Sequence, residues 1–133
     1  MNFIALLCLL PVVAAYNNPP CGLSYEEAEA YKGYADRVKN GLIASCNLFK
    51  EAENAIDGFE PDLENGIKYW VTTSMPYEVS SNVMTLLKEA MQKMPTNLDY
   101  RVKTYGCAFS LKYNTGDDKI DVGCLFSRKT YYG

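Results

Sequence analysis

The stretch Cys107-Ala108-Phe109-Ser110-Leu111-Lys112-Tyr113, followed by Ile120-Asp121-Val122-Gly123-Cys124, decides the fold of this chain. In both runs apolar side chains largely alternate with polar or small ones, which is typical of half-buried strands. The intervening Asn114-Thr115-Gly116-Asp117 is rich in turn residues and predicts a hairpin loop. If Tyr113 faces Asp118, then Cys107 lies opposite Cys124, at about 4.5–5.5 Å between Cα atoms, which a disulfide can bridge.

The cysteines indicate an oxidising compartment. Of the five, Cys8 lies in an apolar N-terminal run, which leaves Cys21, Cys46, Cys107 and Cys124. An even number in a secreted chain predicts two disulfides, for which three pairings exist. A zinc site of four thiolates would need close Cys-x-x-Cys pairs, and the chain has none. The hairpin register favours Cys107–Cys124, which leaves Cys21 to pair with Cys46.

The N-terminal segment predicts secretion. Residues 1–15 carry no charged side chain and end in small residues, so we expect a signal peptide cut near Ala15-Tyr16. This run is too short to span a bilayer, which takes about 20 apolar residues. Residues 16–133 are therefore expected to form a single secreted, extracellular domain without a membrane span.

Charge and composition exclude several classes of function. The net charge is −3, and nucleic-acid binding depends on a basic face, so no nucleic-acid partner is expected. The chain has no histidine, which removes Ser-His-Asp and Cys-His catalysis and every zinc site that contains histidine. We expect a protein that is not an enzyme and that has no catalytic, cofactor-binding or metal-binding residues.

Helical periodicity precedes the hairpin. Ser24 and Glu27 form a capping box, in which each side chain can reach the other's backbone N–H. Four apolar stripes with helical spacing then follow, at residues 28–42, 48–59, 63–71 and 79–94, the last opened by Ser80 or Ser81. A strand is expected near Tyr100–Thr104. Helices followed by strands predict an α+β fold, with helices packed on a small antiparallel sheet.

Tyr105-Gly106-Cys107-Ala108 and Val122-Gly123-Cys124 are similar to the closing hairpin of a known superfamily, and two upstream segments, 23–37 and 45–52, are similar to its helices. They resemble the CAP superfamily (SCP/TAPS), which includes venom allergens and secreted proteins of parasitic nematodes. The resemblance implies a reduced, disulfide-stabilised α-β-α sandwich. It also implies that Cys46, whose usual partner in the first hairpin strand is missing, pairs with Cys21. The family cleft, with two histidines and two acidic residues, cannot be carried over.

Two acidic clusters have a functional and a structural interpretation. Asp117 and Asp118, with Asn114 and Asp121 nearby, offer oxygen ligands for calcium, but a solvated hairpin tip explains them as well. Residues 60–64 include three acids that would suit a carboxylate pair in catalysis. A helix start at Asp62, where negative charge is favoured, is the plainer interpretation.

Other conspicuous side chains are expected in the core. Trp70 could stack on a ligand, although a lone Trp on an apolar stripe is usually buried. Met84, Met91 and Met94 would suit an adaptable binding site, but core filling is the default interpretation. The tail at residues 128–132 is expected to be an exposed terminus that is able to contact a partner.

These observations predict a secreted, non-enzymatic binding protein. The resemblance implies an extracellular effector that acts on host or environmental proteins, with immune modulation as one such role. The alternative is a carrier of a small apolar ligand such as a sterol or fatty acid, since CAP proteins are associated with such ligands. An enlarged apolar cavity would favour the carrier, whereas a tightly packed core would favour a protein partner.

Overall fold

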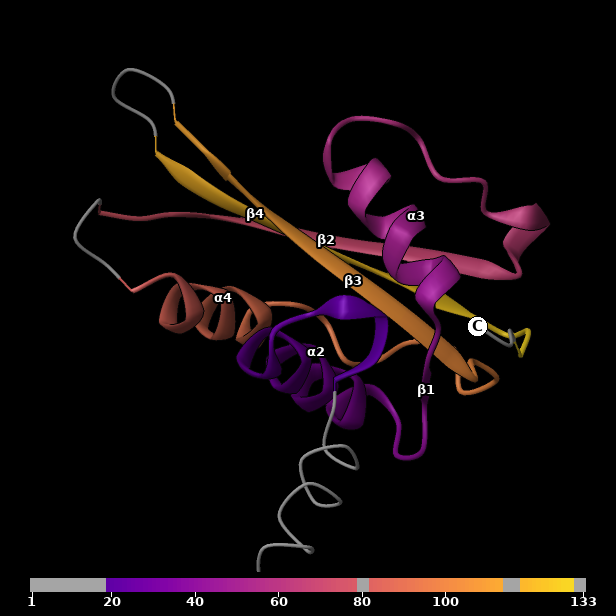
Figure 1. Cartoon of the computed structure of the whole chain (residues 1–133). Helices are drawn as coiled ribbons and strands as arrows, with labels where there is room; N and C mark the ends of the chain where they lie inside the picture. Colours follow the sequence, from indigo (N-terminus) through magenta and orange to yellow (C-terminus); the bar gives the residue numbers. More distant parts are fainter. Residues whose placement is uncertain (1–18, 79–81, 114–117, 131–133) are drawn as a thin grey trace, which may run out of the picture.

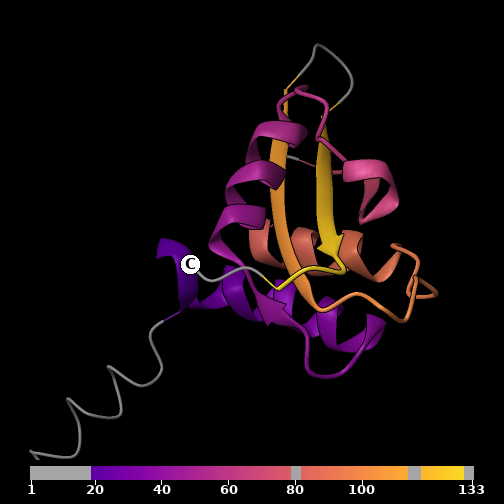
Figure 2. The same ribbon diagram turned by 90° about the vertical axis from the view of Figure 1, so that its right-hand side faces the viewer.

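A computed structural model describes residues 19–78, 82–113 and 118–130 of the chain (Figure 1). The described residues form three α-helices and four strands: α2 (Tyr25–Val38), α3 (Cys46–Ile56), α4 (Val83–Gln92), β1 (Ile43–Ala44), β2 (Lys68–Pro76), β3 (Thr104–Lys112) and β4 (Lys119–Ser127). Two short 3₁₀ turns, η1 (Pro20–Gly22) and η2 (Glu64–Gly66), precede α2 and β2. Helices α2 and α4 cover one face of the sheet and α3 covers the other (Figures 1 and 2). The predicted α+β sandwich is confirmed.

The sheet has the strand order β1-β3-β4-β2. Strand β4 is antiparallel to both β3 and β2, whereas the two-residue β1 runs parallel to β3, so the sheet is mixed rather than purely antiparallel. The hairpin has the predicted register, with Cys107 opposite Cys124. The structure has the disulfides Cys107–Cys124 and Cys21–Cys46, the pairing that the sequence favours.

Each helix begins at a polar side chain that accepts backbone N–H groups. Ser24 accepts from the Glu27 N–H at 3.2 Å, and Ser45 accepts from the N–H of residue 48 at 3.3 Å. Asn82 accepts from the N–H groups of residues 84 and 85 at 3.0 and 3.1 Å and starts α4. The alternative starts at Ser80 and Ser81 lie outside the described residues.

The prediction of a helix at residues 63–71 is wrong. The segment enters β2 after the turn η2, and β2 pairs with β4 along its whole length. Its Tyr, Trp, Val and Thr residues favour strands. The sheet is covered on both faces, so Tyr69 and Val71 pack on the α2/α4 side while Trp70 packs on the α3 side. Apolar residues on both faces of one strand therefore produced a sequence pattern with helical spacing.

The strand expected near Tyr100–Thr104 is also placed wrongly. The Asp99 carboxylate accepts the Arg101 N–H at 2.9 Å, and the Val102 N–H bonds to the Asp99 carbonyl at 3.3 Å, which makes a local turn. Only Thr104 belongs to a strand, as the first residue of β3. An aspartate whose side chain bonds to the backbone two residues later favours a turn over extended pairing.

The helices pack on the two faces of the sheet through separate apolar clusters. The larger cluster lies between the sheet and α2 and α4, and it includes Tyr31, Tyr34, Leu87, Met91 and Phe126. The smaller one lies beneath α3 and consists of Leu48, Ala52, Ala108 and Leu125, with Trp70 and Ile56 at its border. No described helix is both long and apolar enough to cross a bilayer.

Candidate functional site

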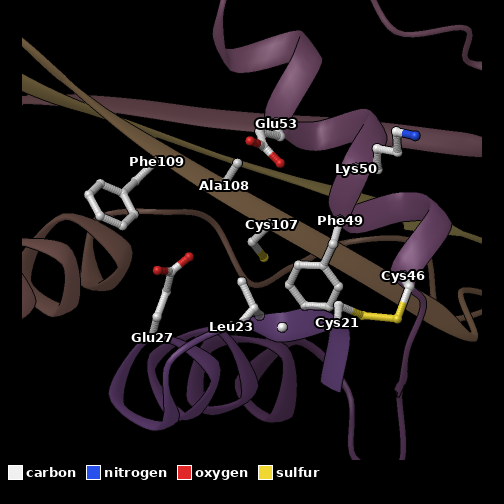
Figure 3. Close-up of a pocket in the computed structure, with 11 residues that line it drawn as sticks. Cys21, Leu23, Glu27, Cys46, Phe49, Lys50, Glu53, Cys107, Ala108 and Phe109 are labelled. Atoms are coloured by element: carbon white, nitrogen blue, oxygen red, sulfur yellow. A yellow bond between two sulfur atoms is a disulfide. The ribbon is translucent and has the colours of Figure 1, made fainter. Parts of the chain in front are cut away.

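A groove of about 600 Å³ lies between α3, the start of α2 and strand β3 (Figure 3). We call it the β3 groove, and its lining includes Leu23, Glu27, Phe49, Glu53 and Phe109. The disulfide Cys21–Cys46 lies at one end and ties η1 to the first residue of α3. Three separate elements are thereby held around one strand of the sheet.

The floor of the groove is a strand edge. Strand β1 pairs only with Thr104 and Tyr105, so from residue 106 onward the described chain places no strand beside β3 on this side. The Cα atoms of Cys107 and Cys124 are 4.0 Å apart, a separation typical of a non-hydrogen-bonded pair in an antiparallel ladder. The N–H and C=O groups of Cys107 therefore point away from β4 and towards the groove.

The same geometry repeats along the strand. Because backbone groups alternate between the two sides of a strand, Phe109 and Leu111 also direct their N–H and C=O groups away from β4. The Tyr105 carbonyl confirms the alternation, since it accepts the Ser45 N–H at 3.0 Å on that side. Within the described residues, no backbone hydrogen bond reaches Cys107, Phe109 or Leu111 from that side. The edge of β3 thus offers three alternate outward-facing residues for pairing, of which Cys107 and Phe109 line the groove.

Aromatic rings close the end of the groove near β1. The Phe49 ring meets Tyr105 edge-on, with 5.7 Å between the centroids, and lies tilted against Tyr31 at 5.8 Å. Phe49 is only 5% exposed, so its position is fixed by packing. This wall belongs to the core, and the adaptable part of the groove lies further along β3.

Two carboxylates approach the groove from opposite walls. Figure 3 shows Glu27 of α2 and Glu53 of α3 directed towards the segment of β3 that carries Ala108. The Tyr31 hydroxyl donates to Glu27 at 2.9 Å. Burial, and then the charges of Glu27 and Glu53, raise the pKa of Tyr31 well above its ordinary range, so both carboxylates act on the same phenol. In the described chain, neither carboxylate has a Lys or Arg within salt-bridge distance.

The donor set does not favour a metal site. The four cysteines of the described residues are in disulfides, and the chain has no histidine. Within the described residues, no group of three or more His, Cys, Asp or Glu side chains is placed to hold a metal ion. The two carboxylates of the groove could offer hard oxygen ligands, but calcium requires six or more.

The structure gives most other candidate residues structural contacts. Asp62 accepts the Glu64 N–H at 2.9 Å just before η2, and Glu64 pairs with Lys68 and Lys129 at 3.4 Å. Asp62 and Glu64 therefore act in a turn and in ion pairs. Residues 114–117, including Asn114 and Asp117, lie outside the described residues, and Asp121 bonds to the Ser74 hydroxyl.

The conspicuous apolar candidates lie mainly in the core. Met91 and Met94 are 1% and 3% exposed, and Met84 packs against the same cluster. Trp70 is half-buried against Gly123 on the α3 face. Arg37, near the end of α2, donates to the Met91 carbonyl at 3.2 Å. It therefore joins α2 to α4.

Sequence reasoning missed the groove, although it found the strand that forms the floor. The hairpin pattern locates β3, but nothing in it shows that β1 stops after two residues. Glu27 was identified only as half of a capping box, and Glu53 was not identified at all. Their spacing along the chain carries no signal, because only the packing of α2 and α3 around β3 brings them together.

Comparison with known proteins supports the fold alone. No family model matches the chain, and no curated protein matches its sequence. A solved structure described as manganese-bound Ac-ASP-7 is similar in fold, with a TM-score of 0.56 and 16% sequence identity. The match covers 86% of this chain and 75% of that chain. The chain therefore adopts the same architecture as that protein.

Proposed function

We propose that this chain is a secreted, non-enzymatic binding protein of the CAP type, which holds an extended, basic segment of an extracellular protein in the β3 groove. The observation that carries the proposal is the edge of β3 along the floor of the groove, beside which the described residues place no further strand. The two disulfides support an oxidising, extracellular setting. An effector role on host or environmental proteins is the functional class that this binding would serve.

Strand addition explains how such a segment would bind. An extended peptide adds to an exposed sheet edge through main-chain hydrogen bonds, and neighbouring pockets select its side chains. Cys107, Phe109 and Leu111 supply the outward groups, and α3 and the start of α2 form the walls. The short β1 strand already pairs in parallel with β3. A peptide that continues beyond it would lengthen the same sheet.

The charges indicate a basic partner. Glu27 and Glu53 approach the edge from opposite sides, and Lys50 is the one cation among the described residues that line the groove. Partly exposed ion pairs contribute only about 0.2–1 kcal/mol each. The carboxylates are therefore expected to set specificity and association rate, while main-chain pairing provides most of the affinity.

The carrier of a small apolar ligand is the weaker alternative. The methionines that would line an adaptable interior are packed in the core, and the lining of the β3 groove includes the charged side chains Glu27, Lys50 and Glu53. A site for a sterol or fatty acid buries most of its ligand among apolar side chains. Native mass spectrometry of the secreted protein would test the carrier directly, because a lipid-sized mass excess lost on denaturation would support it.

A peptide with alternating valine and lysine tests strand addition. Binding is measured by fluorescence anisotropy, and NMR amide shifts report where the peptide lies. We expect amide shifts at Cys107, Phe109 and Leu111. Two further peptides carry N-methyl groups on either the odd or the even residues, and only the one whose methyl groups replace the N–H groups that face β3 should lose binding. Equal binding of the two N-methylated peptides would contradict main-chain pairing.

Variants of the groove sharpen the test. Phe109→Pro removes an N–H that points away from β4, and edge strands tolerate proline at such positions. It should abolish peptide binding, whereas Phe109→Ala, which keeps the N–H, should retain most of it. Glu27→Gln and Glu53→Gln together should lower the affinity for the lysine peptide. The affinity for an analogue with glutamine in place of lysine should not change. Glu89→Gln on α4 is the matched control, because Glu89 does not line the groove.

A further inference from the structure

A second hollow gathers positive charge where β3 begins and β4 ends. It has a volume of about 540 Å³, and its lining includes five cations: Lys39, Arg101, Lys103, Arg128 and Lys129. We call it the basic hollow. Its cations come from three separate parts of the chain, which meet only in the folded protein: the end of α2, the loop before β3, and the residues after β4. The chain as a whole carries a net charge of −3, so this concentration of positive charge runs against the overall composition.

The loop before β3 is held in place by its own contacts. The Asp99 carboxylate accepts from Arg101 Nε at 3.0 Å and Nη2 at 2.6 Å, and from the Tyr69 hydroxyl at 2.6 Å. These bonds hold the pKa of Asp99 well below its usual range. Lys39 Nζ donates to the carbonyls of Tyr100 and residue 102, at 2.8 and 3.0 Å. The cations are therefore presented by a fixed loop, and binding would not have to order it.

The positive charge of the hollow is only partly neutralised. Arg101 and Lys129 have carboxylate partners, Asp99 and Glu64. Lys39 bonds to neutral carbonyls, and in the described chain neither Lys103 nor Arg128 has a carboxylate within salt-bridge distance. Five cations against two carboxylates leave an excess of three positive charges.

The Arg128 side chain has a buried donor atom without a partner among the described residues. Its Nε atom is shielded from solvent and has no hydrogen-bond partner in the described residues. Burial of a charged donor without a partner is costly, by about 1–3 kcal/mol or more. The Arg128 charge also acts on the Tyr69 phenol, opposing the rise in the pKa of Tyr69 that Asp99 causes. An anion in the hollow would compensate a charge that the described residues leave without a carboxylate partner.

We propose that the basic hollow binds a sulfated polysaccharide. Arginine forks match the oxygens of a sulfate group, and lysines add point charges along an anionic chain. The disulfides place the chain in an oxidising compartment, where clustered basic residues meet polymers such as heparin. Anionic lipids are concentrated in the cytoplasmic leaflet and fit this setting less well. The site is separate from the β3 groove, so neither proposal depends on the other.

A heparin-derived oligosaccharide is the probe, with isothermal titration calorimetry as the measurement. We expect binding that weakens steeply as salt is added, because exposed charges are screened beyond about 10 Å at 0.1 M salt. The same oligosaccharide without its sulfate groups should not bind. Equal binding of both forms, or stronger binding to vesicles that contain phosphatidylserine, would overturn the proposal.

Paired variants assign the binding to the hollow. Lys103→Glu reverses an exposed charge and should lower the affinity roughly tenfold, which corresponds to about 1.4 kcal/mol. Lys50→Glu, on the β3 groove, should leave heparin binding unchanged. Arg128→Gln should also weaken binding, and circular dichroism checks that this partly buried site still folds. Equal losses for Lys103→Glu and Lys50→Glu would show general charge attraction and would contradict the assignment.

Discussion

The two faces of the sheet are packed in different ways. On the α2/α4 face, large side chains such as Tyr31, Tyr34, Leu87 and Phe126 fill a broad core. On the α3 face the cluster is small, and the sheet contributes glycines where the helix and Trp70 approach most closely. A Cβ atom on Gly106 would lie 2.2 Å from the Phe49 nitrogen and 2.3 Å from the carbonyl carbon of residue 48.

This difference shows how the fold positions the β3 groove. On the α2/α4 face the distance between layers depends on side-chain volume, which can adjust by rotamer changes. On the α3 face it depends on backbone contact at Gly106, which leaves no side chain to adjust. Helix α3 carries Phe49 and Glu53, so this contact also sets the height of one wall of the groove. A change at Leu87, which does not line the groove, should affect stability alone, whereas changes at Gly106 should affect both stability and binding.

The largest effect is expected on the broad face. Leu87 of α4 is fully buried. Leu87→Ala therefore removes buried methyl groups and leaves a cavity, which should lower the free energy of unfolding by about 2–5 kcal/mol. Urea unfolding of the secreted protein measures this cost. Val83→Ala on the same helix, at a half-buried position, should cost much less. Similar values for the two variants would mean that this face is loosely packed.

The next effect is expected at the closest contact. Gly106→Ala forces the start of α3 away from the sheet, and overpacking of this kind costs about 1–3 kcal/mol. Peptide binding in the β3 groove should weaken in the same variant. Gly33→Ala is the matched control, because a Cβ there meets nothing within 4 Å and alanine favours the interior of α2 by up to about 1 kcal/mol. If Gly106→Ala were as stable as the original protein, the comparison between the faces would fail.

The hairpin and the α2 cap were predictable because their signals are local. The register that pairs Cys107 with Cys124 follows from alternation and turn residues, and Ser24 caps α2 through a residue three positions away. The helix predicted at 63–71 failed because periodicity assumes one buried face. Strand β2 has apolar contacts on both faces, with Trp70 on one and Tyr69 on the other.

The candidate sites were not predictable, because they are made by contacts between distant segments. Glu27 and Glu53 converge only through the packing of two helices around β3. Lys39 and Lys103 meet because Lys39 bonds to the Val102 carbonyl, a contact for which no sequence pattern exists. From the sequence, Arg128 belongs only to a tail that is expected to be exposed, whereas the structure shields its Nε atom from solvent. Long-range placement of charges depends on tertiary packing, which composition and spacing do not encode.

A smaller effect is expected where a side chain can move aside. A Cβ on Gly123 would lie 2.2 Å from the far end of the Trp70 ring, and Trp70 is only half-buried, so the ring can shift towards solvent. Gly123→Ala should therefore cost about 1 kcal/mol, at the low end of overpacking. In a Trp70→Leu background the same change should cost almost nothing. A double-mutant cycle by urea unfolding measures this coupling, and additive costs would mean that Trp70 is not the obstacle.

The smallest effect at neutral pH is expected for Tyr34→Phe. The Tyr34 hydroxyl donates to the Pro95 carbonyl at 2.6 Å, and loss of such a bond costs about 1 kcal/mol. Burial raises the pKa of Tyr34 from 10.0 to about 12, so the folded state favours the neutral phenol. The contribution of Tyr34 to stability is thus complete below pH 10 and is lost as the pH rises through about 12. The stability difference between the original protein and the variant should shrink over this range. A constant difference for Tyr34→Phe would mean that its phenol titrates as it does in the unfolded chain.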